Sequence, residues 1–378
     1  MRKRFSRLLK VFVFVVLFFV LLLRFSYMLR PAITIEGNNE KLGLLGYYAE
    51  KENTIDVLYI GSSDATVFWI PLNAYRDAGF TSYTYGKSML RASMFEDLLN
   101  EALRTQKPSL VVVSMRTILQ SDNVIEEASL RSVTDALPYS SANRWKMIFH
   151  NRGNVVFSQN AAENGENGLP DKGILANIPL YFDIMKYHDN WQTVWEGSFH
   201  YDDLGRFSSS TKGFFIGTGV KSQNRDTSVP FRNETKEPAL SAEKTLRALI
   251  EKAKKEKFEI LFVMPPYCET AADRMLFNRA AEIIAGSGGK AVDFNEYYDL
   301  IGMDESLDYY DPGHTNILGA RKFTAFLTGW LSENYDLPDH RGDPSYASWN
   351  EDLNAWTSSE ADAMRKCLSK QRIDLPRK

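Results

Sequence analysis

Two short stretches of the chain hold side chains that could together perform nucleophilic catalysis. A Gly-Ser-Ser triplet ending at Ser63 follows the apolar run at residues 57–60, and Asp311 stands three residues before His314. A serine hydroxyl becomes an effective nucleophile when an imidazole takes its proton, and a carboxylate orients that imidazole. We therefore predict that Ser63 is the nucleophile, His314 its base and Asp311 the group that orients the base.

Each of these residues also has a simpler interpretation. Ser63 would then be a turn serine that caps the following helix, and Ser62 is an alternative nucleophile. Asp311 would cap the next helix, and His314 would be a surface residue. Catalysis requires that the two stretches, which are far apart in the sequence, meet in the fold.

The pattern of apolar residues supplies elements that would bring them together. Short apolar runs rich in β-branched and aromatic residues predict five strands, at residues 57–60, 81–85, 110–113, 258–264 and 291–294. Helical spacing predicts intervening or following helices at residues 93–105 (with Ser93 as its cap), 242–257, 271–285 and 315–331. This alternation is typical of an α/β fold, a flavodoxin-like doubly wound parallel sheet of about five strands. Right-handed crossovers put the carboxyl ends of all strands at one edge, where both stretches should lie.

The alternation fails between residues 118 and 238, which is too long for one loop. We interpret this segment as a large cap-like insertion. Its aromatic residues would bind sugars or lipid tails, or form a small satellite core; they are Tyr181, Phe182, Tyr187, Trp191, Trp195, Phe199 and Tyr201. The expected domains are an anchor at residues 1–30, a connector at 31–54, an α/β domain at 55–334 that contains the insertion, and a C-terminal extension at 335–378.

The first 30 residues predict a membrane anchor. Residues 11–23 contain no polar side chain, and the apolar stretch extends over residues 8–29 with few interruptions, which is long enough to span a bilayer. Basic residues before it predict a cytoplasmic N-terminus, so the rest of a single-pass bacterial protein would lie outside the cytoplasm. A cleaved signal peptide is the alternative, although Leu23-Arg24-Phe25-Ser26 is a poor cleavage site.

Charge and cysteine content narrow the function further. The whole chain has a net charge of −3, and residues 1–30 carry seven basic and no acidic residues, so the rest is distinctly acidic. An acidic body argues against nucleic acid as the partner. The two cysteines, Cys268 and Cys367, form no CxxC pair and exclude a thiol-ligated zinc site; whether they pair stays open. We expect no cofactor and no metal.

At this point the chain resembles the SGNH/GDSL hydrolase superfamily. The Gly-Ser-Ser triplet matches the family's first block, and Asp311 and His314 match its acid and base. The resemblance implies that the backbone N–H groups of Ser63 and Gly86 stabilise the oxyanion. After the third strand, Ser114-Met115-Arg116-Thr117 replaces the family's Gly-x-Asn-Asp, so Arg116 is our prediction for the missing amide donor. The similarity covers about residues 55–118 and 255–333.

With one N-terminal span, the chain looks like the D-alanyl transfer proteins of teichoic acid synthesis and like polysaccharide O-acetyltransferases or deacetylases. That resemblance implies a membrane-anchored serine esterase or O-acyltransferase acting on acyl esters of cell-envelope glycopolymers. Its partners would be an acylated glycopolymer or lipid-linked substrate, the membrane, and a membrane-bound acyl-transfer protein. The alternative is an inactive or catalytically weak SGNH-fold protein that binds envelope glycan or an acyltransferase partner.

Overall fold

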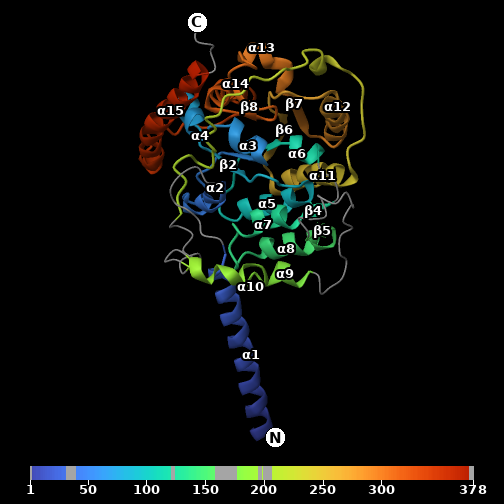
Figure 1. Ribbon diagram of the computed structural model, residues 1–378, viewed down its shortest axis with the longest axis vertical. Coiled ribbons are helices and arrows are strands. Elements are labelled where there is room, and N and C mark those ends of the chain that lie inside the picture. Colours follow the sequence, from blue (N-terminus) through green and yellow to red (C-terminus); the bar gives the residue numbers. More distant parts are fainter. Residues whose placement is uncertain are drawn as a thin grey trace.

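The computed structural model describes residues 2–30, 40–120, 124–157, 177–194, 198 and 207–373. It is a mixed α/β structure around one wholly parallel sheet in the order β2-β1-β3-β6-β7 (Figure 1). The strands are β1 (Val57–Gly61), β2 (Ser82–Gly86), β3 (Leu110–Ser114), β6 (Glu259–Met264) and β7 (Lys290–Asp293). The predicted parallel sheet of about five strands is therefore confirmed, and each strand lies within one residue of its expected bounds.

Helices cover both faces of this sheet, as a buried parallel sheet requires. Every residue of β1, β2 and β3 is buried. Contacts and right-handed crossovers put α4 and α14 together on one face, and α5, α11 and α12 on the other. Their bounds are α4 (Pro71–Ala78), α5 (Phe95–Ala102), α11 (Leu240–Glu256), α12 (Ala271–Gly286) and α14 (Ile317–Asn334).

One predicted helix cap, Ser93, and one cap considered as an alternative, Asp311, are not the observed caps. Ser93 does not cap α5, because its hydroxyl donates to Asn151 Oδ1 and a 3₁₀ turn at Ala92–Met94 leads into the helix. Asp311 does not cap α14 either. Asn316 does so, and its side-chain oxygen accepts from the backbone N–H groups of Leu318 and Gly319.

The segment between β3 and β6 divides into two described parts. The first begins with α6 (Arg116–Leu119), which contacts α11 and α12. Its other short elements lie from α5 towards α1 (Figure 1); they are β4 (Ile125–Glu126), α7 (Glu127–Thr134), α8 (Ala142–Asn151), β5 (Val155–Val156), α9 (Ile178–Tyr181), α10 (Ile184–Tyr187) and the 3₁₀ segment η5 (His188–Thr193). The second, residues 207–231, is mainly extended and ends in the 3₁₀ turn η8 (Val229–Phe231). Trp195, Phe199 and Tyr201 lie outside the described residues, as do residues 31–39 of the expected connector.

The extended part crosses the carboxyl edge of the sheet. It runs past α3 (Ser63–Phe68) and past an antiparallel hairpin formed by β8 (Tyr309–Asp311) and β9 (His314–Thr315). The backbone N–H of Phe215 donates to Thr66 O at 2.7 Å, and that of Lys221 donates to Tyr309 O at 2.8 Å. This segment therefore lies against both stretches that we predict to be catalytic.

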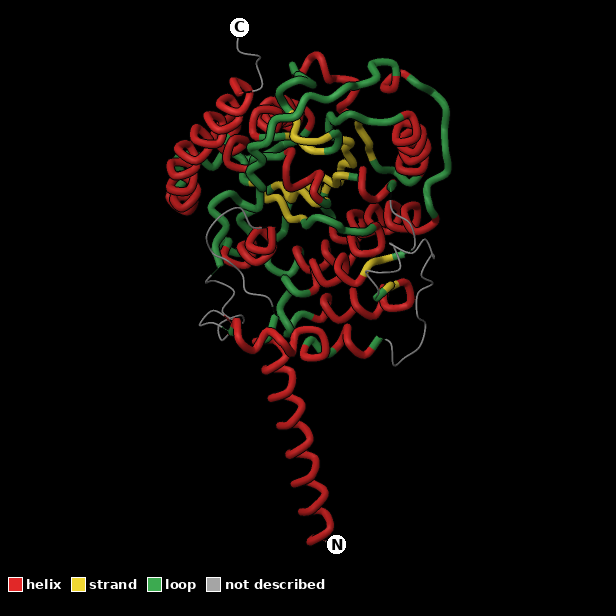
Figure 2. The backbone as a smooth tube through the Cα atoms, viewed as in Figure 1, coloured by secondary structure: helices red, strands yellow, loops and turns green. Residues whose placement is uncertain are grey.

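One helix, α1 (Arg2–Met28), projects from the body (Figure 2). Within the described chain, its Arg4–Met28 portion is long and apolar enough to cross a membrane; an 18-residue window of it has a mean hydropathy of 2.7 and is not buried inside the protein. The remaining α-helices among the described residues are α2 (Glu40–Gly46), α13 (Tyr298–Ile301) and α15 (Ala347–Ile373).

The expected C-terminal extension is packed onto the α/β body through α15. This helix contacts α4 and α14, and its Trp356 is buried against Phe214. The indole N–H of Trp356 donates to Asn73 Oδ1 at 2.8 Å, and Asn73 Nδ2 donates to Glu360. Helix α15 thus covers apolar surface of the α/β body and supplies hydrogen-bond partners to the buried side chain of Asn73.

We therefore expect Trp356→Ala to destabilise the α/β body rather than to release a separate tail. Truncation of a buried tryptophan typically costs about 3–5 kcal/mol, and this one also removes one of the two donors to the side-chain oxygen of Asn73, which keeps only Arg76 Nη1 at 3.2 Å. Thermal unfolding of the detergent-solubilised protein, followed by circular dichroism, measures the effect. Leu368→Ala is the matched control, because Leu368 lies on the same helix but is 46% exposed. Equal melting temperatures for the two variants would contradict the packing role of α15.

Candidate active site

The two predicted catalytic stretches meet at the carboxyl edge of the sheet. Ser63 Oγ lies 2.7 Å from His314 Nε2. His314 Nδ1 lies 2.8 Å and 2.9 Å from the two carboxylate oxygens of Asp311. The serine, imidazole and carboxylate therefore form one hydrogen-bonded chain, in the order that nucleophilic catalysis requires. The His314 side chain is about one-fifth exposed, so solvent reaches these hydrogen-bonded side chains.

In the turn after β1, Ser62 and Ser63 have different hydrogen-bond partners. Ser62 precedes α3, and its hydroxyl accepts from Leu90 N at 3.2 Å and lies 3.3 Å from Lys87 O. It is therefore bound to the loop that follows β2. Ser63 is the first residue of α3, where a backbone N–H has no partner within its own helix. Its hydroxyl, not that of Ser62, reaches the imidazole.

The β8–β9 hairpin is fastened directly to the helix that carries Ser63. Thr315, next to His314, donates its hydroxyl to Val67 O of α3 at 2.9 Å, and this contact is buried. On the other side, the Tyr310 ring lies parallel to the imidazole with centroids 5.5 Å apart. Gly217 of the extended segment packs on Tyr310, where an added Cβ would come within 2.9 Å of the ring. The imidazole is thus held from two sides.

A buried carboxylate that the sequence analysis missed organises the serine turn. Asp64 is fully buried; Oδ1 accepts from the backbone N–H of Ser62 at 3.0 Å and Oδ2 from the Ser114 hydroxyl at 2.6 Å. These bonds link the turn after β1 to the end of β3. The available signal was an acidic residue within an otherwise buried run, directly after the serine.

Gly86 ends β2 beside the serine turn. It is paired in register with Gly61, and an added Cβ would lie only 2.4 Å from Gly61 O. The close approach of the two backbones therefore requires glycine. The contribution of the Gly86 N–H to an oxyanion site stays a prediction.

Arg116 has a partner that the sequence did not reveal. Its Nη1 donates to Gly313 O, and its guanidinium lies 4.8 Å from the centre of the Tyr267 ring. Gly313 separates the acid from the base, so Arg116 holds the turn that orients the imidazole. Its predicted role as an oxyanion donor stays a prediction.

Behind that turn lies a second carboxyl group, which no sequence pattern indicated. Cys268, a free thiol like Cys367, donates its backbone N–H to Pro312 O at 3.0 Å. The next residue, Glu269, is 4% exposed, and both its carboxyl oxygens lack a hydrogen-bond partner among the described residues. Burial, reinforced by the nearby Asp293 carboxylate, raises the pKa of Glu269 to about 9. Glu269 is therefore a neutral acid at pH 7.

Among the described residues, no group of three or more His, Cys, Asp or Glu side chains is arranged to hold a metal ion. A hollow of about 720 Å³ is lined by Lys254, Lys257 and Lys290, among others. It lies where β6 and β7 begin, at the opposite edge of the sheet from Ser63.

Comparison of the chain with models of protein families, with curated proteins and with solved structures found no match. The resemblance to SGNH hydrolases therefore depends on the residues and the geometry described above.

The contact between Arg116 and Gly313 predicts that Gly313→Ala weakens the reactivity of Ser63. An added Cβ would lie 2.2 Å from Arg116 Nη2 and displace the guanidinium from the turn. Small displacements of a catalytic group can cost on the order of 100-fold in rate, so we expect roughly 10- to 100-fold slower labelling by a fluorophosphonate. Gly153→Ala is the matched control, because nothing lies within 4 Å of its added Cβ. Unchanged labelling of the folded Gly313 variant would contradict this role.

The raised pKa of Glu269 predicts a pH-dependent stability. A carboxyl whose pKa is higher in the folded than in the unfolded state favours folding most below its unfolded value, near 4.5, and this contribution is lost as pH rises towards about 9. Glu269→Gln removes the ionisation. We expect its free energy of unfolding, relative to wild type, to increase between pH 5 and pH 9 in denaturant titrations. A constant difference over that range would contradict the shift.

Proposed function

We propose that this chain is a membrane-anchored serine esterase or O-acyltransferase that acts outside the cytoplasm on acyl esters of cell-envelope glycopolymers. The observation that carries the proposal is the hydrogen-bonded chain from Ser63 Oγ through His314 to Asp311. The Gly-Ser-Ser and Asp-x-x-His motifs, and their resemblance to SGNH hydrolases, support it.

The geometry supports a two-step acyl transfer. His314 Nε2 takes the hydroxyl proton of Ser63 as the oxygen attacks the ester carbonyl, and Asp311 stabilises the resulting imidazolium. The backbone N–H groups of Ser63 and Gly86 would stabilise the oxyanion, each worth about 2.7–4 kcal/mol of the barrier by analogy with known oxyanion holes. The leaving alcohol receives the proton from His314. Water or a sugar hydroxyl then gives its proton to His314 as its oxygen bonds to the acyl carbon; the bond from that carbon to Ser63 Oγ breaks, and Oγ takes the proton back from His314.

Three finer features belong to the same proposal. The strand order supports a flavodoxin-like arrangement, with the serine turn beside the point where the order reverses. The contacts of residues 207–231 with α3 and β8 support a capping role for part of the insertion. The basic residues before α1 support a cytoplasmic N-terminus and an exported body.

Loss of catalysis is the second candidate function, and one observation favours it. The side chain that stands where the family has an oxyanion-binding asparagine is Arg116, and its Nη1 is bonded to Gly313 O. A chain without that donor would use the same edge to bind envelope glycan or an acyltransferase partner, with little turnover.

Fluorophosphonate labelling distinguishes the two serines. We expect labelling of the wild type and of Ser62→Ala, whose hydroxyl serves the Leu90 and Lys87 backbone, and none of Ser63→Ala. Ser62→Ala removes one acceptor of the Leu90 N–H, which keeps its 3.3 Å bond to Lys87 O. The loss of such a hydrogen bond costs about 0.5–1.5 kcal/mol, so the melting temperature of this variant is measured in parallel. Absence of labelling in folded wild type would overturn the esterase proposal.

Hydrolysis of p-nitrophenyl acetate separates an enzyme from a binding protein. Loss of the base is expected to lower the rate of a working triad by several orders of magnitude, so His314→Ala should approach background. His150→Ala is the control, because the His150 imidazole lies on α8 and pairs with Asp97 at 2.8 Å, not with a residue of the triad. Equal rates for wild type and His314→Ala would favour the binding protein.

A further inference from the structure

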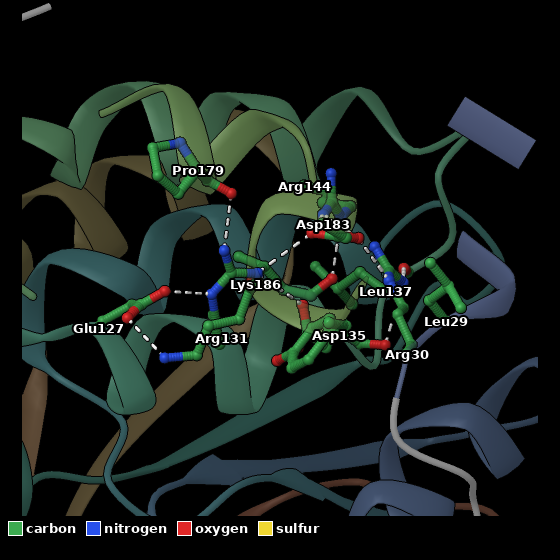
Figure 3. A network of polar contacts seen from close by, with 12 residues as sticks. Leu29, Arg30, Glu127, Arg131, Asp135, Leu137, Arg144, Pro179, Asp183 and Lys186 are labelled. Atoms are coloured by element: carbon green, nitrogen blue, oxygen red, sulfur yellow. Dashed lines mark hydrogen bonds and ion pairs between the residues drawn. The ribbon is translucent and has the colours of Figure 1, made fainter. Parts of the chain in front are cut away.

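A buried cluster of charged side chains joins the end of α1 to the body (Figure 3). Arg30 lies two residues after the helix, and its side chain is fully buried. Its Nε donates to Asp183 Oδ2 at 2.7 Å, and its Nη1 donates to the backbone oxygens of Asp135 and Leu137. The apolar helix is therefore followed at once by a contact inside the protein.

Two further arginines converge on the same carboxylate. Arg131 Nη1 lies 3.1 Å and Arg144 Nη2 3.3 Å from Asp183, and Tyr139 donates its hydroxyl to it at 2.8 Å. Burial alone would raise the pKa of Asp183, but Arg30 and Arg144 outweigh it and lower that pKa. Withdrawal of Arg30 would remove one of the buried charges that keep Asp183 ionised, so the contact is strongly favoured.

The change in exposure along α1 marks where the protein body begins. Phe25 is 58% exposed, whereas Ser26 is fully buried and Tyr27 is 3% exposed. Tyr27 packs edge-on against Tyr139, with ring centroids 4.9 Å apart. If α1 spans a bilayer, the hydrocarbon region must therefore end close to Phe25.

The segment from α10 to η5 lies beside this point. α10 contacts α1, and Asn190 Nδ2 donates to Leu29 O at 3.0 Å. Figure 1 shows α10 at the base of the body, where α1 leaves it. Two large apolar side chains of the segment face solvent: Met185 is 52% exposed and Trp191 is 66% exposed. Tryptophan is enriched at the level of lipid headgroups, where its apolar ring and its N–H are both satisfied.

We propose that the α10–η5 segment lies on the phospholipid surface, with Met185 and Trp191 in the headgroup region, and that the Arg30–Asp183 contact fixes the body at one orientation on its own span. The inference rests on the anchoring role of α1 in the proposed function. It adds a second membrane contact and replaces a freely tethered domain with a docked one. The triad is then held at a constant height above the bilayer, which suits an acyl group on a lipid-linked or membrane-proximal chain.

Depth-dependent quenching tests the contact on the full chain in nanodiscs that contain no other protein. Lipids brominated near the headgroup should quench part of the tryptophan emission, and Trp191→Phe should lose that part. Trp330→Phe is the matched control, because Trp330 lies on α14 in the upper part of the body, away from α1 (Figure 1). Equal quenching of the two variants would overturn the proposal. Protection of Trp191 from aqueous acrylamide in native membranes but not in nanodiscs would also overturn it, in favour of a membrane-protein partner.

A second variant tests the docking. Asp183→Asn keeps the shape of the side chain but removes the charge that Arg30 contacts, so the bromolipid quenching that depends on Trp191 should fall several-fold. Unchanged quenching would overturn the docking role of this pair; should the variant not fold, the comparison of Trp191 and Trp330 still decides the membrane contact. Release of the wild-type chain from membranes at alkaline pH would overturn the anchor itself, and this inference with it. If the chain stays in the membrane but brominated lipids do not quench Trp191, this inference is overturned and the proposed function is not.

Discussion

The candidate site depends on the fastening of a short hairpin to a short helix. Parallel strands bring the serine turn and the acid–base turn to the same edge, but sheet geometry alone does not align them within hydrogen-bond distance. The buried hydrogen bond from Thr315 Oγ1 to Val67 O supplies that alignment. It joins the residue after the base to the helix that begins with the nucleophile. The distance of 2.7 Å between Ser63 Oγ and His314 Nε2 follows from this contact and from the lengths of α3 and β9.

Buried polar groups then hold each half of the site in place. The Asp64 carboxylate accepts from the turn before Ser63 and from the end of β3, and Arg116 donates to the turn before His314. Leaving a buried donor or acceptor without a partner costs more free energy than its hydrogen bond contributes to stability. Turn conformations that break these hydrogen bonds are therefore disfavoured. Both residues thus act on the Ser63–His314–Asp311 geometry through other residues.

The sequence predicted the sheet well because its signal is local and repetitive. The buried strand β3 is apolar from Leu110 to Val113, and polar residues, Ser109 and Ser114, stand on either side of that run. The pairing of Ser63 with His314 could also be predicted, since the carboxyl ends of parallel strands share an edge. Contacts between single side chains and distant side-chain or backbone atoms have no such periodicity. The bond from Arg116 to Gly313 O, which spans 197 positions, and that from Arg30 to Asp183, which spans 153, could not be inferred from spacing.

The same kind of contact links the base of the protein to its catalytic edge. Arg144, which reaches Asp183, lies on α8, and the start of that helix is bonded to α5 through Glu101, a fully buried carboxylate that accepts from Asn143 at 2.9 Å. Helix α5 covers the sheet and follows the loop of β2 whose backbone holds Ser62. Close-packed elements with satisfied polar groups transmit position because they deform little. The contact that orients the body on α1 and the contacts that align the triad are therefore parts of one continuous packed structure.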